Sequence, residues 1–83
     1  MNLKERLTGV LQPFIGPDVD IRWSVPKHVA QGDLSTNAAM IVAKRAGQNP
    51  RELAQKIVDA IDLDTFGLEK AEVAGPGFVN VWI

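Results

Sequence analysis

Three alternate residues near the end of the chain, Phe78, Asn80 and Trp82, have the side chains best suited to binding chemistry. Successive side chains of a strand point to opposite faces of a sheet, so these three are predicted to share the outward face. An exposed ring can stack on an unpaired base, and an adjacent amide can hydrogen-bond the edge of that base. The pattern therefore indicates a surface for single-stranded RNA.

Two alternatives to base stacking remain open for this surface. In the RNA-binding interpretation the intervening residues Val79, Val81 and Ile83 are the core set, but swapped parities would put the aromatic rings in the core instead. The rings could also pack on another domain, because a large outward apolar patch often marks an interface. That second alternative describes a protein-interaction module.

Residue types for catalysis or metal binding are scarce. The single histidine, His28, has no cysteine or second histidine to share a metal with, and is interpreted as a loop residue. The segment 75–77, Gly-Pro-Gly, lacks the spacing of a phosphate-binding loop and predicts a hairpin turn. Asp62 and Asp64 follow a predicted helix and are interpreted as solvated loop carboxylates. We expect no catalytic residue, metal site or cofactor site here.

Basic residues on two consecutive predicted helices could extend an RNA contact. Lys44 and Arg51 are predicted to lie near the facing ends of these helices, around the turn at Gly47. They form either an ordinary solvated face or a small phosphate-contacting patch. The net charge of −1, from nine Lys and Arg against ten Asp and Glu, argues against affinity that depends mainly on general phosphate attraction.

Periodicity predicts the elements that position these residues. The sharpest start is that of the helix capped by Asn49, with Pro50 at its first position and Glu52 at its third. Strands joined by short turns imply an antiparallel sheet and hence an α+β fold with helices packed on one face. In chain order we predict helix 3–14, strand 19–25 (the clearest), a weak strand 28–32, helix 35–46, helix 50–61, strand 69–74 and strand 78–83.

The composition narrows the class of protein. Eighty-three residues make one small domain, and no apolar run approaches the roughly 20 residues that span a bilayer. No signal peptide is visible, so no membrane partner is expected. The absence of cysteine excludes disulfides and fits a cytoplasmic protein.

Four short motifs follow one another in the last two thirds of the chain. They are Gly-Asp-x-x-Thr-Asn at 32–37, Ala-Lys-x-x-Gly at 43–47, Asn-Pro-Arg at 49–51 and Ala-Gly-Pro-Gly-Phe-x-Asn at 74–80. In this order and spacing they resemble the N-terminal additional domain of arginyl-tRNA synthetases. The resemblance covers residues 30–83, and the first thirty residues fit as a leading helix and strand. It implies a two-layer α-β-β-α-β-β core and makes residues 1–83 one tRNA-binding domain.

The resemblance also implies roles for particular residues. Domains of this family dock at the outer corner of the tRNA and contact the D-loop, where an aromatic residue and an amide two positions later meet the arginine-identity nucleotide. On this sequence these are Phe78, which would stack on the base, and Asn80, which would hydrogen-bond its edge. Trp82 is added because it shares their face, and Lys44 and Arg51 as further tRNA contacts. Leu34 stands where the family often has an aromatic residue, so a stacking contact there is not carried over.

The resemblance assigns the chemistry to other domains. The family continues into a catalytic domain with a His-x-Gly-His motif for ATP and then an anticodon-binding domain, and neither lies within these 83 residues. We expect the chain alone to be non-catalytic, excised from a cytoplasmic parent that uses ATP to attach arginine to tRNA(Arg). Its partners would be the tRNA(Arg) D-loop and the catalytic domain of the same protein. The alternative is a non-catalytic protein-interaction or stand-alone RNA-binding module.

Overall fold

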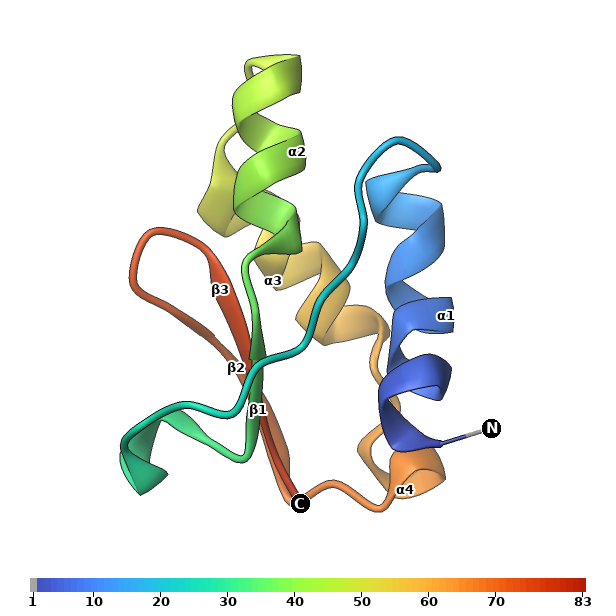
Figure 1. Cartoon of the computed structure of the whole chain (residues 1–83), viewed down its shortest axis with the longest axis vertical. Coiled ribbons are helices and arrows are strands. Elements are labelled where there is room, and N and C mark those ends of the chain that lie inside the picture. Colours follow the sequence, from blue (N-terminus) through green and yellow to red (C-terminus); the bar gives the residue numbers. More distant parts are fainter. Residues whose placement is uncertain (1) are drawn as a thin grey trace.

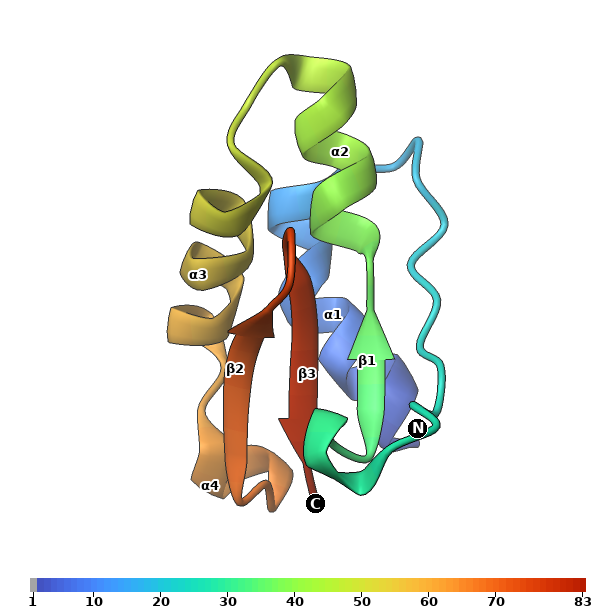
Figure 2. The same ribbon diagram turned by 90° about the vertical axis from the view of Figure 1, so that its left-hand side faces the viewer.

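Two layers make up the computed structural model, which describes residues 2–83 apart from the side chain of residue 29. A three-stranded antiparallel sheet forms one layer, and the α-helices cover one of its faces (Figures 1 and 2). This is the predicted α+β arrangement. The elements in chain order are α1 (Leu3–Ile15), the 3-10 helix η1 (Val29–Gln31), β1 (Leu34–Thr36), α2 (Ala38–Ala46), α3 (Pro50–Ala60), α4 (Leu63–Phe66), β2 (Lys70–Ala74) and β3 (Phe78–Trp82).

The last strand, β3, is the middle strand of the sheet. The order is β1-β3-β2, and β3 pairs antiparallel with both neighbours. Asn80 lies opposite Ser35 of β1 on one side and opposite Glu72 of β2 on the other. The centre of β3 is therefore flanked on both edges.

The core lies between the helices and the inner face of the sheet. Val79 and Val81 are completely buried, as their parity predicted, because this face of β3 is covered by α2 and α3. Ile83 was expected to join them but is 63% exposed, since β3 ends one residue earlier at Trp82. The other buried apolar residues are Leu7, Leu11, Ile15, Leu34, Ala38, Ala39, Ala43, Leu53, Ala54, Ile57, Ile61 and Leu68.

The prediction of a strand at 19–25 is wrong, although the alternation of apolar and polar residues does reflect alternating burial. The segment pairs with β1 only at Ser24, whose backbone exchanges two hydrogen bonds of 2.8 Å with Ser35. Val19, Ile21 and Trp23 pack against the core from an extended backbone. Alternating burial requires extension over an apolar surface but no paired neighbour, so the pattern could not distinguish the two.

The following segment also differs from prediction. The weak strand 28–32 is instead the η1 turn, and the helix predicted from residue 35 begins at Ala38, after β1. Asn37 occupies the N-cap position of this helix. Pairing with β3 holds residues 34–36 extended, which shows a tertiary contact overriding a local helical pattern.

The helix that follows was predicted well because its signals are local. The Asn49 side chain accepts hydrogen bonds from the backbone amides of Arg51 at 2.9 Å and Glu52 at 3.2 Å. The turn after α3 was misread: Asp62 and Asp64 are exposed, but they belong to the start of α4 rather than to a loop. Thr65 donates a 2.8 Å hydrogen bond to Asp62, which helps to close this short helix.

The η1 segment lies against the outer face of the sheet, the face turned toward the viewer in Figure 2. Its approach depends on Gly32, which has a φ of +96°. A Cβ at this position would lie 2.7 Å from the carbonyl oxygen of Val81. The next residue, Asp33, donates its backbone N–H to the same oxygen at 2.8 Å, so the segment is joined directly to β3.

Truncation of two isoleucines, one in the core and one just after β3, should have very different effects on the free energy of unfolding. Ile57→Ala should lower the free energy of unfolding by about 2–5 kcal/mol, because Ile57 is completely buried and its truncation leaves a cavity. Ile83→Ala should change it by no more than about 0.5 kcal/mol, because Ile83 is mostly exposed. Urea denaturation followed by circular dichroism measures both. Equal losses would contradict this description of the core.

Candidate functional site

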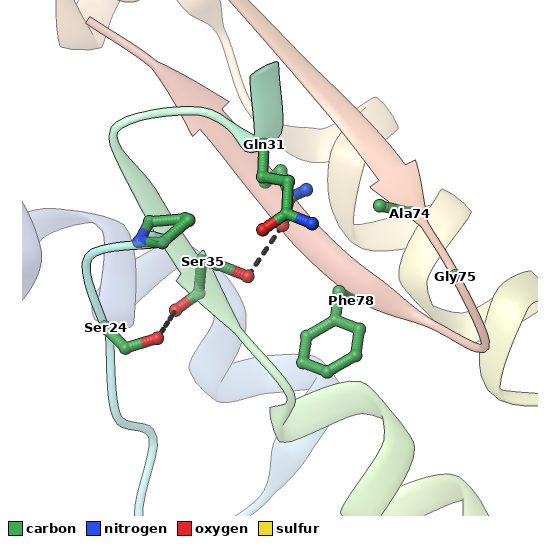
Figure 3. Close-up of a pocket in the computed structure, with 8 residues that line it drawn as sticks. Ser24, Gln31, Ser35, Ala74, Gly75 and Phe78 are labelled. Atoms are coloured by element: carbon green, nitrogen blue, oxygen red, sulfur yellow. Dashed lines mark hydrogen bonds between the residues drawn. The ribbon is translucent and has the colours of Figure 1, made fainter. Parts of the chain in front are cut away.

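A pocket of about 320 Å³ lies on the outer face of the sheet, where β3 meets β1, the η1 segment and the β2–β3 turn (Figure 3). Its walls therefore come from segments that are distant in the sequence. Polar and apolar side chains both face it. The lining residues are Ser24, Pro26, Gln31, Ser35, Ala74, Gly75, Phe78 and Asn80.

Asn80 is buried in this pocket. It faces outward as its parity predicted, yet it is only 4% exposed, because it sits mid-sheet with a strand on either side. Its side-chain oxygen accepts a hydrogen bond of 2.6 Å from the hydroxyl of Ser35, which is also buried. Asn80 is thus a held polar group inside a recess rather than a freely exposed amide.

Phe78 forms an apolar wall of the same pocket and is 36% exposed. It is the first residue of β3, directly after the turn Gly75–Gly77. Gly77 has a φ of +143°, and a Cβ there would lie 3.0 Å from side-chain atoms of Met40 and Pro50. The turn is therefore packed closely on α2 and α3, which sets where Phe78 begins.

Of the two basic residues predicted to contribute, Arg51 lies beside the pocket and Lys44 does not. The Arg51 guanidinium donates a hydrogen bond to the carbonyl oxygen of Gly75, a pocket residue in the β2–β3 turn. Lys44 is exposed in the last turn of α2, which rises beyond the sheet at the top of Figure 2. Within the part of the chain that the structure describes, Lys44 makes no ion pair or side-chain hydrogen bond.

Trp82 shares the parity of Phe78 and Asn80 but does not line their pocket. The Lys70 ammonium lies 4.2 Å from the centroid of its ring, an exposed cation–π contact that contributes about 0.5–1 kcal/mol. A Cβ on Gly32 would lie 3.4 Å from the ring, so the backbone of the η1 segment approaches it closely. The half-buried ring of Trp82 already has protein neighbours.

Three polar residues of the pocket were not identified as site residues from the sequence: Ser24, Gln31 and Ser35. Ser35 reaches Asn80 through the pairing of β1 with β3, and residue 35 was assigned to a helix. Gln31 reaches the pocket because η1 folds back over the sheet (Figure 3). Only long-range contacts could have indicated them: strand pairing for Ser24 and Ser35, and the fold of η1 for Gln31.

Two further features concern residues 2–83 as a whole. No three His, Cys, Asp or Glu side chains in this range gather in a group that could hold a metal ion. None of the helices in the same range is both long and apolar enough to cross a membrane.

Comparison with known proteins gives a consistent result. All 83 residues match the family model described as arginyl tRNA synthetase N terminal domain. The arginine–tRNA ligase of Nitratidesulfovibrio vulgaris strain DP4 is 40% identical over 87 residues, which is 98% of this chain and 16% of that protein. The arginine–tRNA ligase of Staphylococcus aureus strain JH9 is 45% identical over 64 residues, which is 77% of this chain and 12% of that protein.

A solved structure has the same fold. The arginyl-tRNA synthetase of Thermus thermophilus superposes with a TM-score of 0.72 and 25% identity, over 98% of this chain and 13% of that one. The chain therefore spans only 12–16% of the length of these relatives. Because the family model matches from end to end, the chain belongs to the family of arginyl-tRNA synthetase N-terminal domains.

Proposed function

We propose that this chain binds tRNA through the pocket on the outer face of its sheet, as the N-terminal module of an arginine–tRNA ligase. The observation that carries the proposal is one pocket that pairs the half-exposed ring of Phe78 with the held amide of Asn80, in a chain of this family. A flat ring beside a fixed amide suits an unstacked base, which needs both a surface to stack on and a partner for its edge.

The RNA segment that we propose is the D-loop of tRNA(Arg). Sequence-specific RNA recognition usually targets unpaired loops, whose bases can leave the stack and enter a recess. The pocket volume of about 320 Å³ is within the range of small-ligand sites and suits one base rather than a helix. A single nucleotide of the loop would then enter the pocket between Phe78 and the η1 segment.

Phosphates next to that nucleotide would meet the basic residues. Arg51 is held at the β2–β3 turn by one N–H, and its remaining N–H groups can bind a phosphate oxygen. Lys44 would contact a more distant phosphate, because it extends from the far end of α2. Trp82 would support the surface as an anchored ring beside the base site. Two such cations give a modest electrostatic share, as expected for a net charge of −1.

The complete protein is proposed to be a cytoplasmic arginine–tRNA ligase. The support is that the relatives quoted above carry that name and are much longer than this chain. Arginine activation with ATP and esterification of the tRNA would then belong to its catalytic domain, a second partner of this module. The module itself would add affinity and identity readout at a distance from the reaction.

A protein-interaction module is the second candidate, favoured by two exposed aliphatic side chains. Val25 is 72% exposed and Ile83 is 63% exposed, and neither lines the pocket. Such residues could face another domain, although single exposed apolar side chains are common on protein surfaces. This candidate predicts no salt-dependent affinity for tRNA.

Removal of the Phe78 ring should weaken tRNA binding. Phe78→Ala should cost about 1–3 kcal/mol of binding free energy, because one base loses its stacking partner. Filter binding of cognate tRNA(Arg) measures the loss, with circular dichroism to verify the fold. The matched control is Phe66→Ala in α4, whose ring packs 5.1 Å from the Arg6 guanidinium instead. An unchanged affinity for folded Phe78→Ala would refute the proposed site.

Salt dependence should identify the phosphate contacts. Arg51→Gln and Lys44→Gln should each reduce the slope of log K against log salt concentration by about 0.7, because each variant releases one counterion fewer. Lys4→Gln, at an exposed position of α1 in the helical layer, is the control and should leave the slope unchanged. If Arg51→Gln and Lys44→Gln keep the slope of the unaltered chain, Arg51 and Lys44 do not contact the RNA backbone.

A further inference from the structure

The amide of Asn80 is anchored on one side only. Its oxygen Oδ1 accepts the Ser35 hydroxyl, and both residues are more than nine-tenths buried. Among the described residues the amide nitrogen Nδ2 makes no hydrogen bond, while Asn80 lines the pocket. The group left available to a pocket ligand is therefore the NH₂ donor.

Oγ of Ser35 and Oδ1 of Asn80 are 2.6 Å apart, within the usual range of O–H···O hydrogen bonds. In this arrangement the hydroxyl donates to the amide oxygen, and the NH₂ group is turned away from Ser35.

Ser35 is itself held firmly in place. Its backbone N–H and C=O pair with Ser24 at 2.8 Å each, and the Ser24 hydroxyl adds a 3.3 Å contact to the same carbonyl (Figure 3). The opposite edge of β1 pairs with β3, with Ser35 directly across from Asn80. The backbones of Ser35 and Asn80 are thus both held by strand pairing. The Ser35 hydroxyl therefore lies where it can hydrogen-bond the Asn80 amide.

We propose that Ser35 is a positioning residue that holds Asn80 as a hydrogen-bond donor, so that the pocket selects an unpaired base presenting an acceptor at that point. The inference rests on the proposed RNA-binding function. The bases present their Watson–Crick acceptors at different points: N1 in adenine, N3 and O2 in cytosine, O6 in guanine, and O2 and O4 in uracil. An amide free to rotate could offer its oxygen or its NH₂ group to any of these edges, whereas a fixed donor favours the bases whose acceptor lies where it points.

The orientation is testable without RNA. In the isotopically labelled chain, nuclear Overhauser effects from the Asn80 NH₂ protons to the Ser35 β-protons should be weak, because the oxygen faces the hydroxyl. In Ser35→Ala the amide should turn about its Cβ–Cγ bond more freely, so the effects from its NH₂ protons to the β-protons of residue 35 should become stronger. Strong effects from the NH₂ group to the Ser35 β-protons in the unaltered chain would overturn the inference.

The consequence for recognition is testable with synthetic hairpins of the tRNA(Arg) D-arm. Each unpaired loop position is varied among the four bases, and the largest affinity ratio at one position defines the discrimination. Ser35→Ala should reduce this ratio by roughly tenfold, the equivalent of about one hydrogen bond. Ser35→Thr, which keeps the hydroxyl, should preserve it.

Thr65→Ala is the control, because it removes a hydroxyl that bonds Asp62 in α4, outside the pocket. A preserved ratio in Ser35→Ala, or an equal loss in Thr65→Ala, would overturn the positioning role. If the unaltered chain binds none of the hairpins, the RNA-binding function fails, and the nuclear Overhauser measurement alone decides how Asn80 is oriented.

Discussion

The placement of β3 between β1 and β2 is the constraint on which the rest of the structure depends. One face of this strand contributes Val79 and Val81 to the core, and such burial stabilises by about 1.5–3 kcal/mol per side chain. The other face carries Phe78 and Asn80 into the pocket. Because both edges of β3 are paired, its side chains cannot change face without breaking two ladders of hydrogen bonds. The core of this small domain therefore fixes the geometry of its candidate site.

A mid-sheet position explains how Asn80 is both buried and available. Neighbouring strands and the η1 segment shield it from bulk water, which strengthens its hydrogen bonds, while the pocket keeps one side open. A buried amide with a single internal partner would be costly unless water or a ligand satisfies the other group. The same shielding would make recognition sensitive to a mismatched base, since an unpaired donor in a recess has few alternative partners.

The features that the sequence predicted depend on local physics. The Asn49 cap and the helix after it follow from contacts within four residues, and the valines of β3 follow from two-residue alternation. The errors involve distant pairing: β1 was assigned to a helix because only β3 holds it extended, and segment 19–25 is extended with a bridge at Ser24 alone. Phe78 and Asn80 could be named in advance, whereas Ser35 and Gln31 could not, because the strand register and the fold of η1 bring them there.

Titration of the isotopically labelled chain with cognate tRNA(Arg), followed through the amide resonances of every residue, tests most directly whether the pocket side of the sheet binds RNA. The largest changes are expected on Phe78, Asn80 and Gln31 and on the β2–β3 turn, with α1 nearly unaffected. Changes concentrated on α1 and α4, with the pocket residues unmoved, would contradict this assignment.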